Sequence, residues 1–244
     1  MKIQSWLTLY AMAYRGSGTA TGIDGVYGPA TEQAVINFQK AERIPQTGAV
    51  DQEVFNLLCG PLRRAFEGPI AGTGLRQLIV NTAYHHANQN PFELEIKGQP
   101  NSGPWVRAYM NGHEGTDWLW CMGFVQTMID QAASNLGKNF TDLMPLTFSC
   151  DTVGITGLQK GLLTRFSEVR SNPQQVKPGD IFLVQKTPHD WTHTGIITAV
   201  SDSIFETVEG NTNEGGSTNG FAAVKRIRNY TTSKLDVFSI EPLV

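Results

Sequence analysis

The spacing of apolar residues changes once along this chain, and the change limits the folds that it can adopt. Before Pro178, the recognisable segments repeat apolar residues every three or four positions, which predicts helices. Beyond Pro178, short apolar runs are separated by turn residues, which predicts strands at 180–185, 193–200, 204–209, 224–228 and 237–241. Helices followed by a strand meander indicate an α+β fold with an antiparallel sheet.

Composition excludes some classes of function. A chain of 244 residues that is 40% hydrophobic can bury a core without disulfides or metals. The net charge is −3 and the Lys and Arg residues are scattered, so we expect no nucleic-acid binding. No window approaches the roughly 20 apolar residues of a membrane span. Of the three cysteines, Cys59 and Cys150 could pair, although small buried thiols are the favoured interpretation.

The N-terminus allows two interpretations. Ile3, Trp6, Leu7, Tyr10 and Ala11 recur at helical spacing, which predicts an amphipathic helix over residues 2–15. The alternative is a signal peptide that ends at the small residues of 11–13, but polar residues interrupt its apolar run. We therefore expect synthesis in the cytoplasm without a secretion signal.

The first sixty residues predict three helices. The second helix follows Gly28-Pro29, where a proline is tolerated at a helix start, and the third follows Asp51, a suitable N-cap. Prolines and glycines beyond Gly60 suit a linker. The expected organisation is a small three-helix bundle at 1–62, a linker at 63–74 and a second domain at 75–244.

The bundle resembles the family of peptidoglycan-binding helical domains. The resemblance rests on the segment Asp24-Gly25-Val26-Tyr27-Gly28-Pro29-Ala30-Thr31, then on Ala34, Phe38-Gln39, Thr47-Gly48-Ala49-Val50 and Leu57. It implies that the bundle binds the cell-wall polymer through the loop of residues 24–31, with Asp24, Tyr27 and Thr31 as candidate ligand contacts. The alternative is that these residues only shape a turn.

Cys121 is the candidate nucleophile. It precedes Phe124, Val125, Met128, Ile129 and Ala132, whose spacing predicts a helix with one buried face. A cysteine in the first turn lies near unpaired N–H groups and the positive end of the helix dipole, which favour the thiolate. Trp118 and Trp120, just upstream, are candidates to line the substrate site.

His193, Glu209 and Asn211 are candidate partners for this cysteine. A histidine at the start of a strand can accept the thiol proton and return it to a leaving amine. Gly195, two positions on, removes bulk on the same face. Glu209 or Asn211 could orient the imidazole, and the sequence leaves both open. His113 remains an alternative partner for Cys121.

Trp120-Cys121-x-x-Phe124-Val125, Pro178-Gly179-Asp180, His193-x-Gly195-Ile196 and Glu209-Gly210-Asn211 together resemble the CHAP family, which is related to the NlpC-type papain-like hydrolases. The resemblance covers residues 100–228 and implies a papain-like domain. It also implies that Cys121 is the nucleophile, His193 the base, Glu209 the orienting carboxylate and Asn211 a supporting polar group. Met122 departs from the small residue that is common there. The resemblance implies no cofactor and no metal. The four-residue spacing of His189 and His193 would suit a zinc site only on a helix, and Pro188 disfavours a helix there.

The expected function is hydrolysis of peptidoglycan, at an amide bond of the stem peptide or between N-acetylmuramic acid and L-alanine. The expected partner is bacterial peptidoglycan, and the expected oligomeric state is a monomer. A wall-anchoring protein without activity and an acyl transferase are the alternatives. A phage lysin released through holin pores and an effector delivered by a secretion system both fit action at the cell wall or in the periplasm.

Overall fold

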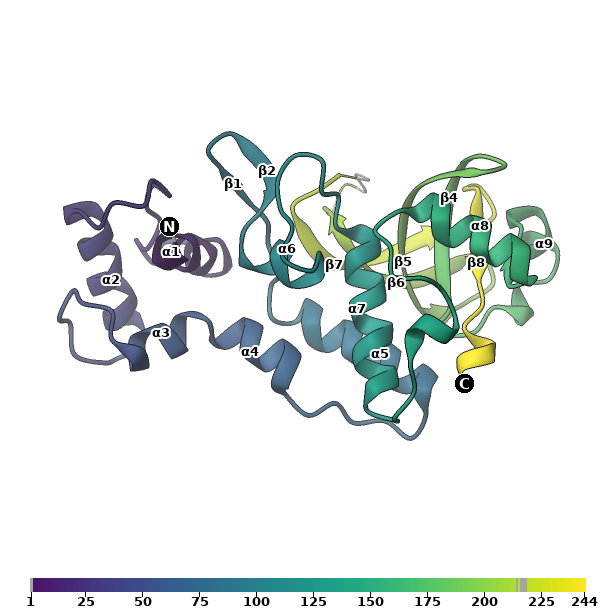
Figure 1. The fold of residues 1–244 in the computed structure, drawn as a ribbon, viewed down its shortest axis with the longest axis horizontal. Helices are drawn as coiled ribbons and strands as arrows, with labels where there is room; N and C mark the ends of the chain where they lie inside the picture. The colour runs from purple at the N-terminus through teal and green to yellow at the C-terminus, as the bar shows by residue number, and fades with distance from the viewer. Residues whose placement is uncertain (1, 214, 216–218) are drawn as a thin grey trace. The chain divides into compact units, whose positions relative to one another are not determined.

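The computed structural model describes residues 2–213, 215 and 219–244 (Figure 1). The chain divides into two compact units. The first unit contains Met1–Gly68 and Gln89–Trp118, and the second contains Pro69–Asn88 and Leu119–Val244. The predicted α+β fold is confirmed, with an N-terminal helical region and antiparallel sheets. Within the described ranges, no helix combines the length and apolar character needed to span a membrane.

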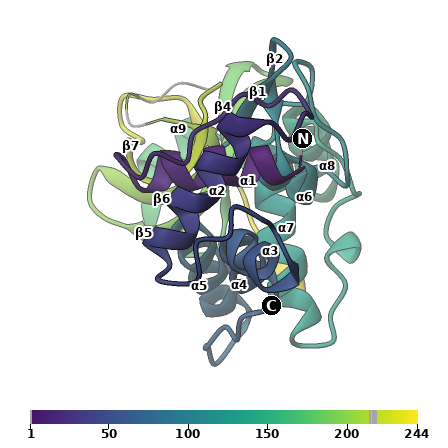
Figure 2. The ribbon, with the colours of Figure 1, turned by 90° about the vertical axis from the view of Figure 1, so that its left-hand side faces the viewer.

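The first unit begins with the predicted bundle. Its helices are α1 (Lys2–Ala13), α2 (Pro29–Ala41), α3 (Gln52–Leu58) and α4 (Gly60–Glu67). Helix α1 contacts both α2 and α3, as Figures 1 and 2 show. Trp6, Leu7, Val35, Phe38 and Leu58 form its buried interior. The carboxylate of Asp51 accepts a hydrogen bond from the Val54 amide at 2.8 Å and so caps α3, as predicted.

Two features of the first unit differ from the expected domain organisation. The expected linker at 63–74 is helical as far as Glu67, because Pro61 lies at the start of α4 and Ala65 is fully buried. Residues 89–118 also belong to this unit rather than to the second. They form the hairpin β1 (Leu94–Ile96) and β2 (Gln99–Ser102) and the helix α6 (Pro104–Tyr109), which contacts α1.

The second unit is built on a six-stranded sheet with the order β3-β8-β4-β5-β6-β7. All its neighbouring strands pair antiparallel. The five predicted strands are observed, and β3 is an addition that the sequence did not predict. The strands are β3 (Leu163–Thr164), β4 (Ile181–Thr187), β5 (Asp190–Val200), β6 (Ile204–Thr212), β7 (Ala222–Asn229) and β8 (Leu235–Phe238).

Helices α5 (Leu75–Ala87), α7 (Cys121–Ser134) and α8 (Cys150–Lys160) all contact β5, and α9 (Phe166–Ser171) contacts β8. Short 3-10 turns lie at Phe140–Asp142, Pro173–Gln175 and Glu241–Leu243. Asp180 fixes the start of β4, because its buried carboxylate accepts hydrogen bonds from Arg76 of α5, from the Lys177 amide and from the Ile240 amide. The Pro178-Gly179-Asp180 motif therefore ties a helix to the sheet.

Candidate active site

Cys121 is the first residue of α7, as predicted. The helix begins there because the carbonyl of Trp120 accepts the first helical hydrogen bond, from the Phe124 amide at 2.9 Å. The predicted core residues Phe124, Val125, Met128, Ile129 and Ala132 are all fully buried. The Cys121 side chain lies at the N-terminal end of this anchored helix and is only 4% exposed.

A glycine in β6 brings the start of α7 close to the sheet. A Cβ atom at Gly210 would lie 2.6 Å from Cβ of Phe124 and 3.0 Å from Cζ3 of Trp120. Only a residue without a side chain allows this approach. Trp120 itself is completely buried, so it packs the helix start against β6 rather than presenting its ring to solvent.

His193 and Glu209 meet across strands β5 and β6. Nε2 of His193 donates to Oε2 of Glu209 over 2.9 Å, and both side chains are fully buried. Ile196 pairs with Val208, so Gly195 lies opposite Glu209. A Cβ at Gly195 would lie 2.7 Å from Cγ of Glu209. Gly195 therefore gives the carboxylate room to reach the imidazole.

Two further side chains hold the Glu209 carboxylate. Thr207 donates to Oε1 at 2.6 Å, and Nε of Arg228 donates to the same atom at 2.8 Å. Nε of Arg226 lies 4.0 Å from it. Burial opposes ionisation, but the hydrogen bonds from Arg228 and His193 outweigh it and lower the pKa of Glu209 to about 2. Glu209 is therefore an anion under physiological conditions.

Cys121 and His193 shift each other's pKa. A hydrogen bond from the Cys150 thiol lowers the pKa of Cys121 well below its ordinary value; burial opposes this, and the interaction with His193 lowers it further. Burial disfavours the charged imidazole, but the neighbouring Cys121 sulfur and the Glu209 carboxylate raise the pKa of His193. Nδ1 of His193 is buried and makes no hydrogen bond among the described residues, so it is the imidazole nitrogen that is open to interaction with the Cys121 sulfur. The arrangement favours a thiolate–imidazolium pair.

The Asn211 amide is directed at the segment that leads into β7. The backbone of this residue adopts φ +53°, and the pairing of β6 with β7 shifts register between Glu209 and Thr212, so the regular alternation of faces is interrupted although the strand continues to Thr212. Nδ2 of Asn211 donates to the Gly220 carbonyl at 2.8 Å. Of the two candidates that the sequence left open, Glu209 bonds to His193, and the Asn211 amide bonds to the Gly220 carbonyl.

His113 and Trp118 belong to the first unit. Their rings stack with centroids 4.0 Å apart and an interplanar angle of 4°. His189 is exposed in the turn between β4 and β5, whereas His193 is buried, so these two histidines lie in different environments. No group of three His, Cys, Asp or Glu side chains within the described ranges could hold a metal ion.

The loop of residues 24–31 is organised by a residue that the sequence did not single out. Gln4 of α1 is 3% exposed; its Nε2 donates to Asp24 at 2.7 Å and to Thr31 at 3.2 Å, and its Oε1 accepts from the Gly25 amide at 2.8 Å. Thr31 is buried, whereas Asp24 and Tyr27 are exposed. Thr31 therefore shapes the loop, and Asp24 and Tyr27 remain candidates for ligand contact.

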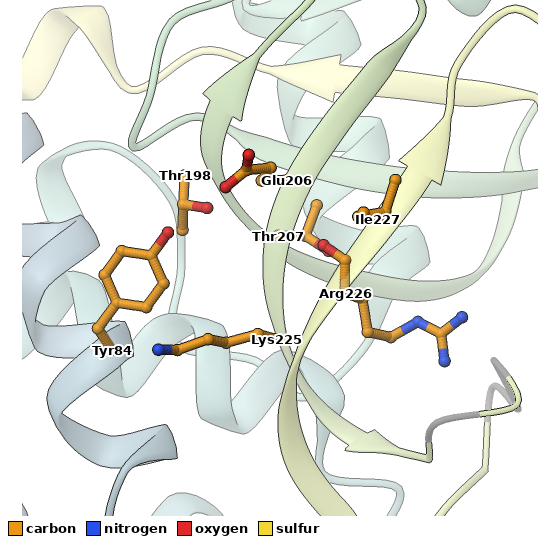
Figure 3. Close-up of a pocket in the computed structure, with 7 residues that line it drawn as sticks. All are labelled: Tyr84, Thr198, Glu206, Thr207, Lys225, Arg226 and Ile227. Carbon is orange, nitrogen blue, oxygen red and sulfur yellow. The ribbon is translucent and has the colours of Figure 1, made fainter.

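A pocket of about 640 Å³ lies between α5 and strands β5, β6 and β7 (Figure 3). The Lys225 ammonium lies 4.8 Å from the centroid of the Tyr84 ring. Thr207 and Arg226, which approach Glu209, form part of the wall, whereas Cys121 and His193 do not line it. The pocket therefore adjoins the carboxylate that supports His193 rather than the sulfur. Its lining residues are Tyr84, Thr198, Glu206, Thr207, Lys225, Arg226 and Ile227.

Four residues of these two sites escaped sequence reasoning: Gln4, Cys150, Thr207 and Arg228. Gln4 lies beside the apolar positions Ile3 and Leu7 of the first predicted helix, which was the available signal for it. Thr207 shares the face of Glu209 by period-two alternation, so it too could have been found. The contact of Cys150 with Cys121 depends on helix placement, and that of Arg228 with Glu209 depends on strand register. Neither can be read from the sequence.

Comparison with known proteins gives one match. Residues 2–58 match the family model of a peptidoglycan binding domain. No curated protein and no solved structure matches the chain. The resemblance to CHAP hydrolases thus stays a prediction, whereas the N-terminal resemblance is supported. Residues 2–58 thus form a helical domain of the peptidoglycan-binding type, which indicates an association with the bacterial cell wall.

Proposed function

We propose that this chain is a cysteine-dependent peptidoglycan hydrolase. It cleaves an amide bond in the stem peptide or the bond between N-acetylmuramic acid and L-alanine. The observation that carries the proposal is the buried arrangement in which the His193 imidazole bonds to Glu209 and helps to lower the pKa of the Cys121 thiol. The N-terminal domain supports the assignment of peptidoglycan as the substrate, because binding of this domain would keep the second unit at the polymer.

The reaction is acyl transfer to water. The Cys121 thiolate attacks the scissile carbonyl, and amide N–H groups at the start of α7 stabilise the oxyanion. The imidazolium of His193 then protonates the departing amine, which leaves an acyl-enzyme. His193, now neutral, takes a proton from water, whose oxygen attacks the thioester and releases the acid. Glu209 keeps the imidazole oriented and stabilises its positive charge.

Purified peptidoglycan tests the proposal. The wild type should release new amino groups and carboxylic acids, and mass analysis of the muropeptides names the bond. Cys121→Ala and His193→Ala should each lower the rate by roughly 10³-fold or more while the protein still sediments with peptidoglycan. Cys59→Ala is the matched control, because Cys59 lies in the first unit, and it should cleave like the wild type.

The result separates the alternatives. Undiminished release by Cys121→Ala would refute the mechanism. Binding without any release by the wild type would leave an anchoring protein, and a product that carries an added amine instead of a carboxylic acid would identify a transferase. Action at the cell wall, after release by a holin or delivery by a secretion system, belongs to the same proposal.

A further inference from the structure

Two cysteines begin two different helices and meet at the candidate site. Cys121 is the first residue of α7, and Cys150 is the first residue of α8. Their Sγ atoms lie 3.9 Å apart, and the residues are 4% and 8% exposed. Cys150 thus contacts the candidate nucleophile, although the proposed hydrolysis assigns it no step.

The second unit holds both helix starts in place. Gln126 of α7 donates to the Pro145 carbonyl at 2.9 Å and accepts from the Thr147 amide at 3.0 Å, which clamps the segment leading into α8. Asp151 of α8 accepts a 2.6 Å hydrogen bond from the Trp191 amide of β5. A Cβ at Gly154 would lie 2.5 Å from the Trp191 ring, so α8 packs tightly on that strand. The two sulfurs are therefore held as neighbours.

The two thiols differ in protonation. His193 and the Cys150 thiol favour the thiolate at Cys121, as described above. The hydrogen bond that Cys150 donates to Cys121 raises the pKa of Cys150 well above its ordinary value, and burial raises it further. Oxidation of the Cys121 thiolate to a sulfenic acid removes the anion that raises the pKa of Cys150, and a second cysteine beside a sulfenic acid is the pairing that forms a disulfide.

We propose that Cys121 and Cys150 form a peroxide-reactive dithiol whose disulfide reversibly blocks the Cys121 sulfur. The dithiol chemistry is independent of the proposed hydrolysis; only the loss of hydrolysis on oxidation depends on it. A disulfide has an S–S distance of about 2.05 Å, so the sulfurs must approach by roughly 1.9 Å, which side-chain rotation and small shifts of the two helix starts supply.

The steps balance with a hydroperoxide as the oxidant. The Cys121 thiolate attacks one peroxide oxygen, the O–O bond breaks, and sulfenic acid and an alkoxide or hydroxide form; the latter takes up a proton. The Cys150 sulfur then attacks the sulfenic sulfur, its proton leaves with the hydroxyl group as water, and the S–S bond forms. Two thiols of an external reductant restore both cysteines by exchange and become a disulfide themselves. Without Cys150, the sulfenic acid can be oxidised further to sulfinic acid, which thiols do not reduce.

Mass spectrometry of the full chain after hydrogen peroxide treatment tests this. Trypsin cleavage after Arg107, Lys138 and Lys160 places Cys121 in the peptide 108–138 and Cys150 in the peptide 139–160. In the wild type, we expect these peptides to be joined, with the mass of two hydrogens lost, and dithiothreitol to separate them. In Cys150→Ala, we expect Cys121 to gain two oxygens that dithiothreitol does not remove. Cys59→Ala should behave like the wild type.

The wild-type protein alone can overturn the proposal. The proposal is contradicted if Cys121 of the wild type forms sulfinic acid as fast as Cys121 of Cys150→Ala and no joined peptides appear. A disulfide that contains Cys59 would contradict it as well. Joined peptides in a protein that never cleaves peptidoglycan would support the dithiol and refute the proposed hydrolysis. Reversible loss of cleavage in parallel with the joined peptides would support both.

Discussion

Nε2 of His193 lies 2.9 Å from Oε2 of Glu209, and neither side chain is exposed to solvent. The carboxylate that orients the imidazole is itself held by Arg228 and Thr207. A buried carboxylate with three such donors is both a functional group and part of the core. Changes at Glu209 should therefore alter stability together with activity.

Removal of the Glu209 charge should destabilise the protein. We expect Glu209→Gln to lower the free energy of unfolding by about 3 kcal/mol, because breaking a buried pair leaves the partner charge without compensation. The measurement is urea denaturation followed by circular dichroism. Glu206→Gln is the matched control. Glu206 is exposed on the same strand, so this substitution should change the free energy of unfolding by no more than about 0.5 kcal/mol. Equal midpoints for the two variants would show that the buried carboxylate contributes no net stability.

The stability of the wild type should fall in acid. The pKa of Glu209 is lowered in the folded protein from an ordinary value of 4.5 to about 2. A depressed pKa means that the unfolded chain binds the proton more readily, so the contribution is complete above about pH 5 and is lost as the pH falls to about 2. The shift corresponds to a contribution on the order of 3 kcal/mol. Unfolding measured from pH 2 to 6 checks this, and the Glu209→Gln variant should lack this part of the slope. Parallel curves for the two proteins would contradict the assignment.

Loss of the Cys150 thiol should make Cys121 less acidic. Cys150→Ala removes the hydrogen bond that contributes most to the low pKa of Cys121, so the titration of Cys121 should move to higher pH. The pH dependence of alkylation by iodoacetamide, with Cys121 quantified by mass spectrometry, measures this titration. Cys59→Ala should leave the Cys121 titration unchanged. A Cys121 titration at the same or lower pH in Cys150→Ala would show that Cys150 does not stabilise the thiolate.

Gln4 should matter for binding to peptidoglycan although it is buried. Gln4→Ala removes the side chain that joins Asp24, Gly25 and Thr31, so we expect roughly tenfold weaker cosedimentation with purified peptidoglycan and a loss of about 1–3 kcal/mol in stability. Gln33→Ala is the control, because Gln33 is exposed on α2 and bonds to Asn37 in a surface pair. If both variants bind like the wild type, the loop of residues 24–31 is not part of the binding surface.

Much of the fold could be predicted because periodicity is a local property. The helix that begins at Cys121, the five predicted strands and the cap at Asp51 all follow from residues within a few positions of each other. The linker prediction failed up to Glu67 because glycine and proline mark a helix start as well as a flexible segment. The inclusion of residues 89–118 in the first unit depends on packing against α1, to which no local pattern refers.

The sequence by itself determined that a cysteine begins a helix, that a histidine belongs to a strand and that the next strand offers a carboxylate and an amide; the predicted start of the histidine strand was wrong, because β5 begins at Asp190. Only the tertiary structure showed that Glu209 bonds to His193 and that the Asn211 amide bonds to Gly220, because the pairing of β6 with β7 shifts register between Glu209 and Thr212. It also brought Cys150 to Cys121 across 29 positions and placed Arg228 on Glu209 across 19. Side-chain chemistry and the spacing of apolar residues are local properties of the chain, whereas strand register and helix placement are set by the packing of the whole unit.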